Sequence, residues 1–466
     1  MDRVRTFRTS SIPWLAALAF GAWAAAIAAA PSLELRVLLA APAAALGVLW
    51  WTVQRPGRWV ALFLATALLL PPLPIAIGNS GPHPCLVFAA IGVFCGFLWL
   101  ADWRIAPTGL NAAFLVFFGV LLVSVAPAAW YSGESAAAGS LARVALFGIS
   151  VYVFFYTAYG PGAQDARVPL RALFWIAVAS ALFACVDFYY QFPAPAGYGP
   201  QFVWLDSGIY RRAQGLFYEA GTLGNFCAFF LAMIVVAFSR PRGSAPISRK
   251  ALLAGGAVFF AALVLSYSRS SLVNVATACG VLVWHNRKRI PLVKVALGLA
   301  VPAGAATLLT WKVFPTFAEM YWLRLSASAE YLFSATNGVL SGRVESWRLL
   351  TTWISANPWQ ALFGIGYKTL PYSDYLGSTV VADNMYLSML VETGIAGLAA
   401  LLWLSVAILR GAGRAAGSDD PRTAFYGSWM LCFWPGQMVQ MLSADVLTFW
   451  RVLPVYFWIL ALAVRA

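Results

Sequence analysis

Residues 341–348 read Ser-Gly-Arg-Val-Glu-Ser-Trp-Arg, and they lie inside a polar segment, residues 311–383. On both sides the chain consists of apolar blocks long enough to cross a bilayer as helices, which takes about 17 to 25 residues. Charged residues and turns do not fit in the hydrocarbon. We therefore expect a large loop or lid outside the membrane at 311–383, with an amphipathic helix beginning at Gly342-Arg343. This loop separates a transmembrane helix bundle at 1–310 from C-terminal transmembrane helices at 384–466. A second outer segment, at 189–219, lies within the first bundle.

The composition is that of a polytopic membrane protein. Of the 466 residues, 61% are hydrophobic and 10% are charged, against about 25% charged in soluble proteins. The apolar blocks are continuous, which favours helices over a barrel of alternating strands. We predict an all-α polytopic fold of about 12–14 transmembrane helices. The candidate spans are 12–30, 33–51, 59–77, 84–101, 109–127, 140–159, 170–188, 220–238, 250–267, 270–284, 291–310, 384–409, 423–442 and 447–464, of which the pair around Ser268 can also form one broken helix.

The basic residues predict the orientation, because Lys and Arg in short loops stay in the cytoplasm. Alternate connections hold 20 of the 31 basic residues with 5 acidic ones, whereas the opposite side holds 11 basic and 12 acidic residues. Both termini are therefore expected in the cytoplasm and 311–383 outside. The net charge of +14 is read as a topology signal, and nucleic acid is not an expected partner.

Five arginines are predicted at the outer ends of spans: Arg143, Arg211, Arg212, Arg269 and Arg343. Guanidinium groups are costly in lipid and usually face the bundle interior or a wet cavity. Their planar fork also binds phosphate bidentately, so we expect them to hold a pyrophosphate group. Other readings stay open: Arg143 can snorkel to headgroups, Arg343 can pair on its own helix, and one of Arg211 and Arg212 can face the surface.

Two carboxylates and an amide are the candidate catalytic groups. Asp383 and Asn384 open the apolar block at 384–409, and Glu219 precedes the block at 220–238. An ionised carboxylate can accept or orient a hydroxyl proton. Asp383 can instead cap its helix, and Glu219 can pair with Arg211 or Arg212.

No metal site and no cofactor are expected. The two histidines, His83 and His285, are too few for a metal cluster, and the six cysteines are scattered with no CxxC pair. This pattern also argues against a disulfide framework.

Three passages resemble the O-antigen ligase and polymerase superfamily of bacterial inner-membrane glycosyltransferases. They are Ser266-Tyr267-Ser268-Arg269-Ser270, Ser341-Gly342-Arg343 with the later turn Gly364-Ile365-Gly366, and Asp383-Asn384-Met385-Tyr386-Leu387 continuing to Glu392-Thr393-Gly394. The resemblance covers residues 205–405 in motif order.

The resemblance implies a helical, C-type glycosyltransferase that works at the periplasmic face without metal or nucleotide sugar. Its donor would be a glycan on undecaprenyl pyrophosphate, and its acceptor a glycan or lipid A-core. The arginines would hold the pyrophosphate leaving group, and the acceptor hydroxyl would attack the anomeric carbon with inversion. The lipid bilayer and other polysaccharide-assembly proteins are the remaining candidate partners.

The residue before Asn384 differs from the one in the superfamily's ligases, and the difference bears on whether the chain is a polymerase or a ligase. Those ligases carry His-Asn where this chain has Asp383-Asn384. This difference favours an O-antigen or exopolysaccharide polymerase over a ligase that uses lipid A-core, while the ligase stays open because Asp can also act as a base.

A transporter or flippase for lipid-linked sugars is the alternative from another class, and an export scaffold is a third. Transporters place charged sites near the middle of the membrane, whereas the charged candidates in this chain gather at the predicted outer surface. The sequence therefore favours the enzyme.

Overall fold

The structure is a computed structural model that describes residues 12–73, 81–161, 170–195, 197–205, 208–241, 243–287, 343–373 and 375–465, with scattered positions between 311 and 326. Helices dominate these residues, and the strands among them form one short hairpin. The predicted span at 291–310 and Gly342 lie outside the described residues. The all-α membrane fold class is confirmed.

The helices follow one another along the chain from an N-terminal pair to a C-terminal group of three. They are α1 Ile12–Ala29, α2 Leu33–Gln54, α3 Arg58–Leu69, α4 Cys85–Leu98, α5 Gly109–Val123, α6 Val125–Tyr159, α7 Leu170–Tyr190, α8 Ala220–Ser239, α9 Arg249–Leu265, α10 Arg269–His285, α13 Arg343–Ala356, α14 Pro358–Phe363, α15 Met385–Ala416, α16 Pro421–Gln440 and α17 Leu453–Val464. The hairpin pairs β1 Phe202–Leu205 antiparallel with β2 Gly208–Arg211, in the register Phe202 to Arg211.

Four helical stretches of the described residues are long and apolar enough to cross a membrane: Gly109–Tyr159, Leu170–Tyr190, Ala220–Ser239 and Met385–Ala416. The spans predicted at 59–77, 84–101 and 447–464 form the shorter apolar helices α3, α4 and α17. The stretch around Ser268 is two helices, α9 and α10, rather than one. Tyr267 between them has φ +52°, a left-handed conformation that does not continue a helix.

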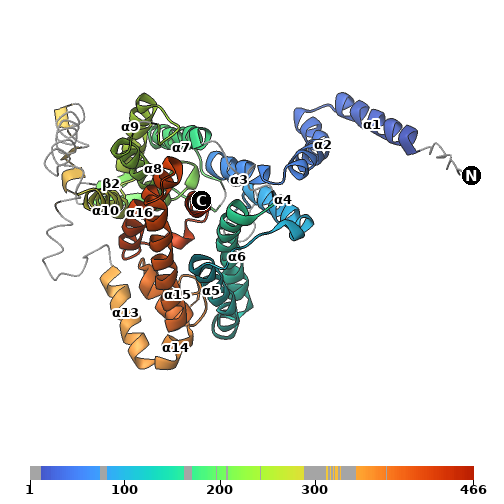
Figure 1. Cartoon of the computed structure of the whole chain (residues 1–466). Helices are drawn as coiled ribbons and strands as arrows, with labels where there is room; N and C mark the ends of the chain where they lie inside the picture. Colours follow the sequence, from blue (N-terminus) through green and yellow to red (C-terminus); the bar gives the residue numbers. More distant parts are fainter. Residues whose placement is uncertain are drawn as a thin grey trace, which may run out of the picture.

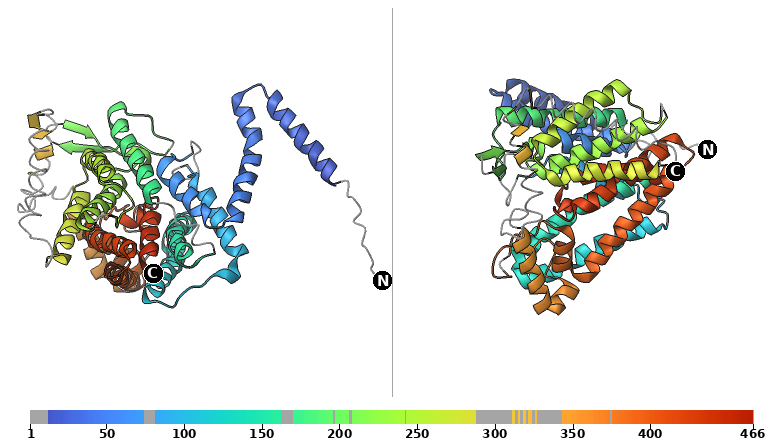
Figure 2. Two further views of the ribbon diagram at one scale, coloured as in Figure 1. Left: turned by 45° about the horizontal axis from the view of Figure 1, so that its top comes forward. Right: turned by 90° about the vertical axis from the view of Figure 1, so that its left-hand side faces the viewer.

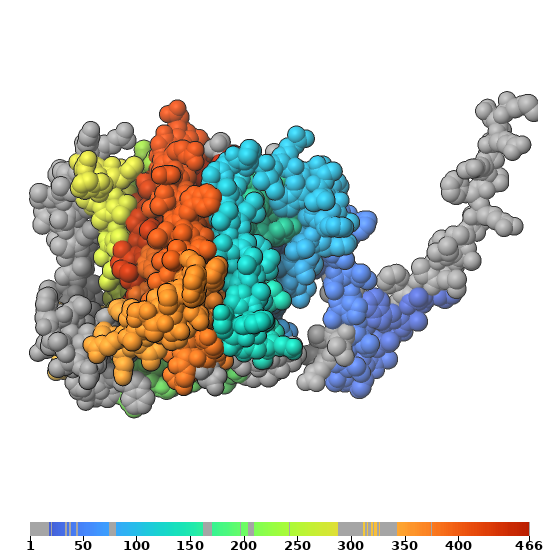
Figure 3. Space-filling view, turned by 90° about the horizontal axis from the view of Figure 1, so that it is seen from below, coloured from blue at the N-terminus to red at the C-terminus, as the bar shows by residue number. Residues whose placement is uncertain are grey.

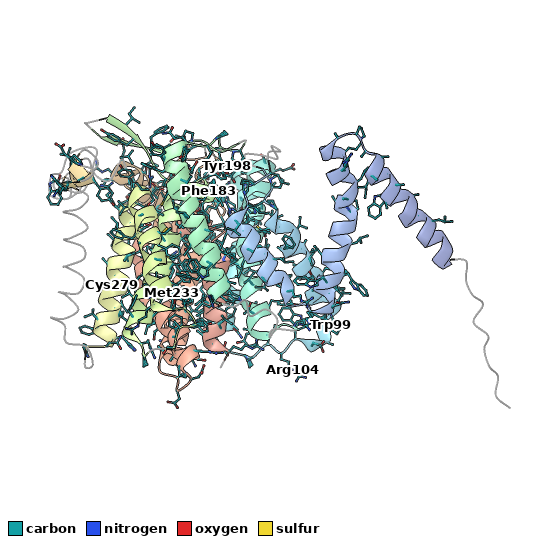
Figure 4. The ribbon with its side chains drawn as sticks, turned by 90° about the horizontal axis from the view of Figure 1, so that it is seen from above. Trp99, Arg104, Phe183, Tyr198, Met233 and Cys279 are labelled. Carbon is teal, nitrogen blue, oxygen red and sulfur yellow. The ribbon has the colours of Figure 1, made fainter. Side chains whose placement is uncertain are left out.

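The bundle is arranged around α16, which packs against α8, α10, α15 and α17. These helices lie side by side in Figure 1. Helices α1 and α2 extend away from the bundle next to α4 (Figures 1 and 2). Figure 4 places Arg104 and Tyr198 at opposite ends of the bundle. The predicted topology requires this separation, because it assigns the two residues to connections on opposite sides of the membrane.

The segment that follows α13 packs against a break in α15. Gly394 interrupts that helix with φ +71°. The amide of Ile365 donates to the carbonyl of Val391 at 3.2 Å. The amide of Gly366 donates to the carbonyl of Glu392 at 2.8 Å. In the space-filling view the α13–α14 segment (orange) covers the bundle between the C-terminal helices and the teal α5–α6 region (Figure 3).

This contact requires glycine at two positions. Gly364 has φ +79°, and a Cβ atom there would overlap the backbone of Glu392. A Cβ atom on Gly394 would overlap the backbone of Leu362 and Phe363. Both positions combine a left-handed backbone, which favours glycine, with a close approach of two chain segments. The predicted turn at 364–366 is therefore a turn that rests directly on α15.

We predict that Gly394→Ala strongly destabilises the protein. The substitution adds left-handed strain of about 1–2 kcal/mol and pushes the turn at 364–366 off α15. Thermal unfolding of the purified protein in detergent measures the effect. Gly280→Ala in α10 is the matched control, since its Cβ would meet open space and alanine favours a helix by up to about 1 kcal/mol. An unchanged unfolding temperature for Gly394→Ala would contradict the packing described above.

Candidate active site

Arg343 and Asp383 form an ion pair at the N-terminal end of α15. The Nε of Arg343 lies 2.9 Å from Oδ2 of Asp383, and both side chains are partly exposed. One turn further along α13, the indole of Trp347 donates to the carbonyl of Ala382 at 2.6 Å. These two contacts hold the amphipathic helix against the residues that precede α15.

Asn384, rather than Asp383, caps α15. Its side-chain oxygen accepts a hydrogen bond from the amide of Leu387 at 3.1 Å, the typical N-cap contact. Asp383 lies just before the cap with φ +45°. Its carboxylate therefore points to Arg343 and away from the helix amides.

Arg211 and Arg212 point to different places. Arg211 ends β2 and pairs with the buried Asp187 of α7 at 3.4 Å. The Nε of Arg212 donates to the carbonyl of Ser266 at 2.9 Å, and the amide of Ala213 donates to the carbonyl of Leu265 at 2.9 Å. Arg212 is thus the member of the pair that lies beside the passage containing Arg269.

A polar chain through α16 links Arg269 to the start of α15. Arg269 is the first residue of α10. The side-chain amide of Gln440, at the end of α16, donates to the hydroxyl of Ser271 at 3.1 Å. The next carbonyl, that of Met441, accepts from the amide of Met385 at 2.8 Å. The N-terminus of α10 and the N-terminus of α15 are therefore fixed relative to each other.

Electrostatics indicates that five of the predicted side chains share one region. Burial lowers the pKa of Arg212 to about 10. The carboxylates of Glu219 and Asp383 oppose this shift, whereas the guanidinium groups of Arg343 and Arg269 add to it. Burial also lowers the pKa of Arg269, and the charge of Arg343 contributes in the same direction.

Glu219 is the partly buried carboxylate of this group. It precedes α8, and the hydroxyl of Thr222 donates to its Oε2 at 2.6 Å. Burial raises the pKa of Glu219, while the Thr222 hydrogen bond and the charge of Arg212 lower it. The net effect is a carboxyl group that holds its proton to higher pH than an exposed Glu.

Arg143 lies apart from these residues. Its guanidinium donates to the carbonyl of Gly139 at 3.0 Å and lies 4.1 Å from the ring centre of Tyr372. Its charge acts on Lys368 and Tyr367. Arg143 therefore packs under the segment after the turn at 364–366, a different position from the snorkelling one that its sequence also allowed.

Lys368 and Asp445 were not among the residues predicted from the sequence. They form an ion pair in which the Lys368 side chain is only 5% exposed. Lys368 has φ +59°, and burial lowers the pKa of its ammonium group while the carboxylates of Glu392 and Asp383 counteract that shift. The available signal was one lysine two residues after a glycine turn on a predicted outer surface, which is too weak to select it.

Arg451 was also not predicted, and its contacts are structural. It is 6% exposed, and its guanidinium donates to the carbonyls of Ala67 at 2.7 Å and Leu70 at 2.8 Å. It also donates to the carbonyl of Leu216 and lies 5.2 Å from the ring centre of Phe217. Arg451 thus ties the end of α3 to the segment that carries Arg212 and Glu219.

The arrangement favours an anionic ligand. Three arginines and two carboxylates influence one another, and mutual repulsion among the guanidinium groups is relieved when a phosphate binds between them. The carboxylate of Asp383, which is partly exposed, can accept a proton from a neutral hydroxyl. A nucleophile and an anionic leaving group can therefore be held side by side.

The long apolar helices define the chain as an all-α polytopic membrane protein. More narrowly, residues 254–402 match the family model described as O-antigen ligase. This match confirms the resemblance to the O-antigen ligase and polymerase superfamily and supports a role in glycan transfer. No curated protein matches the chain. The matched segment contains Arg269, Arg343, Asp383 and Asn384, whereas Arg143, Arg211, Arg212 and Glu219 precede it.

We predict that Glu219 stays protonated above the ordinary pKa of a Glu side chain, 4.5. Because burial favours the neutral form, its carboxylic acid band in the infrared spectrum persists as pH rises through that value and disappears only at higher pH. The variant Glu219→Gln lacks this band, while the variant Glu134→Gln, at an exposed position, retains it. Identical acid bands in wild type and Glu219→Gln would contradict the burial of this group.

Proposed function

We propose that the protein is a glycosyltransferase that moves a glycan from undecaprenyl pyrophosphate to a sugar hydroxyl at the periplasmic face. The observation that carries this proposal is the ion pair of Arg343 with Asp383 at 2.9 Å, together with the hydrogen bond that holds Arg212 beside the passage containing Arg269. These side chains come from three separate parts of the chain. The O-antigen ligase family match at residues 254–402 supports the same reaction class.

In this proposal the arginines bind the leaving group. The bond between the anomeric carbon and the pyrophosphate oxygen breaks, and the electron pair leaves with the lipid pyrophosphate. Fixed guanidinium groups stabilise the negative charge that develops there. Arg212, Arg269 and Arg343 take this role.

The carboxylates serve the acceptor. A hydroxyl oxygen of the acceptor sugar forms the new bond to the anomeric carbon from the side opposite to the leaving group, so the configuration inverts. Asp383 receives the hydroxyl proton, since its carboxylate is partly exposed at the outer end of α15. Glu219 lies deeper and orients Arg212. Asn384 shapes the site by holding the helix start next to Asp383.

A polymerase is the favoured activity within this class. The residue before Asn384 is Asp rather than the His of the superfamily's ligases, and the proposed acceptor is therefore the end of another lipid-linked glycan. The second candidate is a ligase that uses lipid A-core, which the description of the matching family favours. The proposed location is the bacterial inner membrane, with both termini in the cytoplasm.

Removing any one of the three arginines or Asp383 should abolish glycan transfer while leaving the protein folded. We expect Arg212→Ala, Arg269→Ala, Arg343→Ala and Asp383→Ala to lose at least about 100-fold in rate, as removal of one charge-stabilising donor does in other enzymes. Arg343→Lys should also be impaired, because an ammonium group lacks the bidentate fork. The measurement is glycan transfer from a lipid-linked repeat unit by purified protein.

The matched control is Arg422→Ala, at an exposed position in the first turn of α16, which should transfer at the wild-type rate. The exposed ion pair of Arg343 and Asp383 contributes only about 0–1 kcal/mol to stability, so its variants should unfold near the wild-type temperature. Wild-type rates in all four alanine variants would refute the proposed site.

The same assay separates the two activities. We expect glycan growth on the lipid carrier when the lipid-linked repeat unit is the only substrate. Added lipid A-core should accept little or no glycan. Transfer to lipid A-core alone, with no growth on the carrier, would instead identify a ligase.

A further inference from the structure

A second cavity lies next to the proposed active site and is not part of it. Its volume is about 200 Å³, below the range of about 300–1,000 Å³ typical of pockets for drug-sized ligands. The cavity suits one small ring rather than a lipid chain. The residues that matter for its chemistry are Asp187, Gln191, Phe192, Ala194, Arg211 and Tyr218.

The segment 211–219 separates this cavity from the arginine cluster, which consists of Arg212, Arg269 and Arg343. Arg211 and Arg212 are consecutive at the end of β2, where successive side chains point to opposite sides. Arg211 lines the cavity, while Arg212 is coupled to the charges of the proposed active site. Likewise, Tyr218 lines the cavity, while Glu219 is coupled to Arg212 in the proposed active site. A ligand that reacts in the arginine cluster can thus extend into the cavity.

The charges of the cavity select a neutral ligand. The guanidinium of Arg211 lies 3.4 Å from the carboxylate of Asp187, and both side chains are largely buried. An anion that approached Arg211 would be repelled by Asp187. The Nε of Arg211 is buried and has no hydrogen-bond partner among the described residues. The pair therefore offers a donor and an acceptor side by side, which is the pattern that recognises hydroxyl groups.

The remaining wall is apolar and aromatic. Phe192 is 45% exposed, and Tyr218 stands beside Tyr198 with their ring centres 5.1 Å apart. Rings of this kind present flat apolar faces next to a polar edge. A pyranose has the complementary surface, because its C–H groups form an apolar face and its hydroxyl groups form a polar rim.

We propose that this cavity binds one neutral sugar residue of the glycan, next to the residue that reacts in the arginine cluster. This inference rests on the proposed function, since it assigns the cavity to the same lipid-linked substrate. It gives Arg211 and Asp187 a role in recognising the sugar and none in holding pyrophosphate.

The test uses two probes on the purified full-length protein in nanodiscs. The first is the free oligosaccharide released by mild acid from the lipid-linked repeat unit, and the second is inorganic pyrophosphate. Binding of each is measured by calorimetry. We expect Ala194→Trp, which fills the cavity from an exposed position, and Arg211→Met to weaken oligosaccharide binding by at least about tenfold, or about 1.4 kcal/mol. Pyrophosphate binding should not change in either variant.

Tyr189→Ala is the matched control, because this neighbouring aromatic residue is 79% exposed and does not line the cavity. It should bind both probes as the wild type does. No oligosaccharide binding to the wild type, or equal binding to Ala194→Trp, overturns the inference. Loss of pyrophosphate binding in Ala194→Trp would also overturn it, since the cavity would then belong to the anion site.

The two proposals fail separately. If the wild type binds the oligosaccharide in the cavity but neither binds pyrophosphate nor transfers glycan, the sugar site stands and the proposed function falls. If it transfers glycan and Ala194→Trp binds the oligosaccharide normally, the proposed function stands and the sugar site falls.

Discussion

Two backbone hydrogen bonds join the turn at residues 364–366 to the membrane bundle. They run from Ile365 and Gly366 to carbonyls of α15, next to the break at Gly394. A regular helix has no spare carbonyls in its interior, because each accepts from the amide four residues later. The break frees carbonyls to accept from the turn, and the side chain of Glu392 adds a hydrogen bond from the amide of Leu370 at 3.1 Å.

Hydrogen bonds between polar side chains inside the bundle also fix the relative positions of the helices that carry the site residues. The side-chain amide of Asn225 in α8 donates to the Oε1 atoms of Gln437 at 2.6 Å and Gln440 at 2.8 Å in α16. Asn274 of α10 donates to Gln440 at 2.9 Å, and the hydroxyl of Tyr456 in α17 donates to Asn225 at 2.6 Å. Hydrogen bonds between helices help to fix their register in a membrane. The same helices carry Arg269 and follow Glu219, so this network sets where those side chains meet.

The sequence predicted the long apolar helices well and the short ones poorly. The spans predicted at 220–238 and 384–409 correspond to α8 and the first part of α15, because hydropathy alone defines them. The span predicted at 59–77 ends early, at Leu69, since Pro71 and Pro72 follow and residues before proline leave the helical region. The apolar composition of the whole block had concealed this stop.

At the candidate site, sequence reasoning named residues that the structure places near one another and also Arg143 and Arg211, which the structure places elsewhere, and it could not assign their partners. It named Arg212, Arg269, Arg343 and Asp383, because charges at the outer ends of apolar blocks need a reason to be there. It could not separate Arg211 from Arg212, since the partner of Arg211 is on α7. The pair of Lys368 and Asp445 joins segments that are distant in sequence, and no local pattern predicts such a contact.

The central claim is that Arg212, Arg269 and Arg343 surround one pyrophosphate. The most direct measurement is a cryo-electron microscopy map of the protein in nanodiscs with undecaprenyl pyrophosphate bound. The account predicts density for both phosphates between these three guanidinium groups, with Asp383 beside them. Phosphate density located against Arg211 and Asp187, or away from all three arginines, would contradict it.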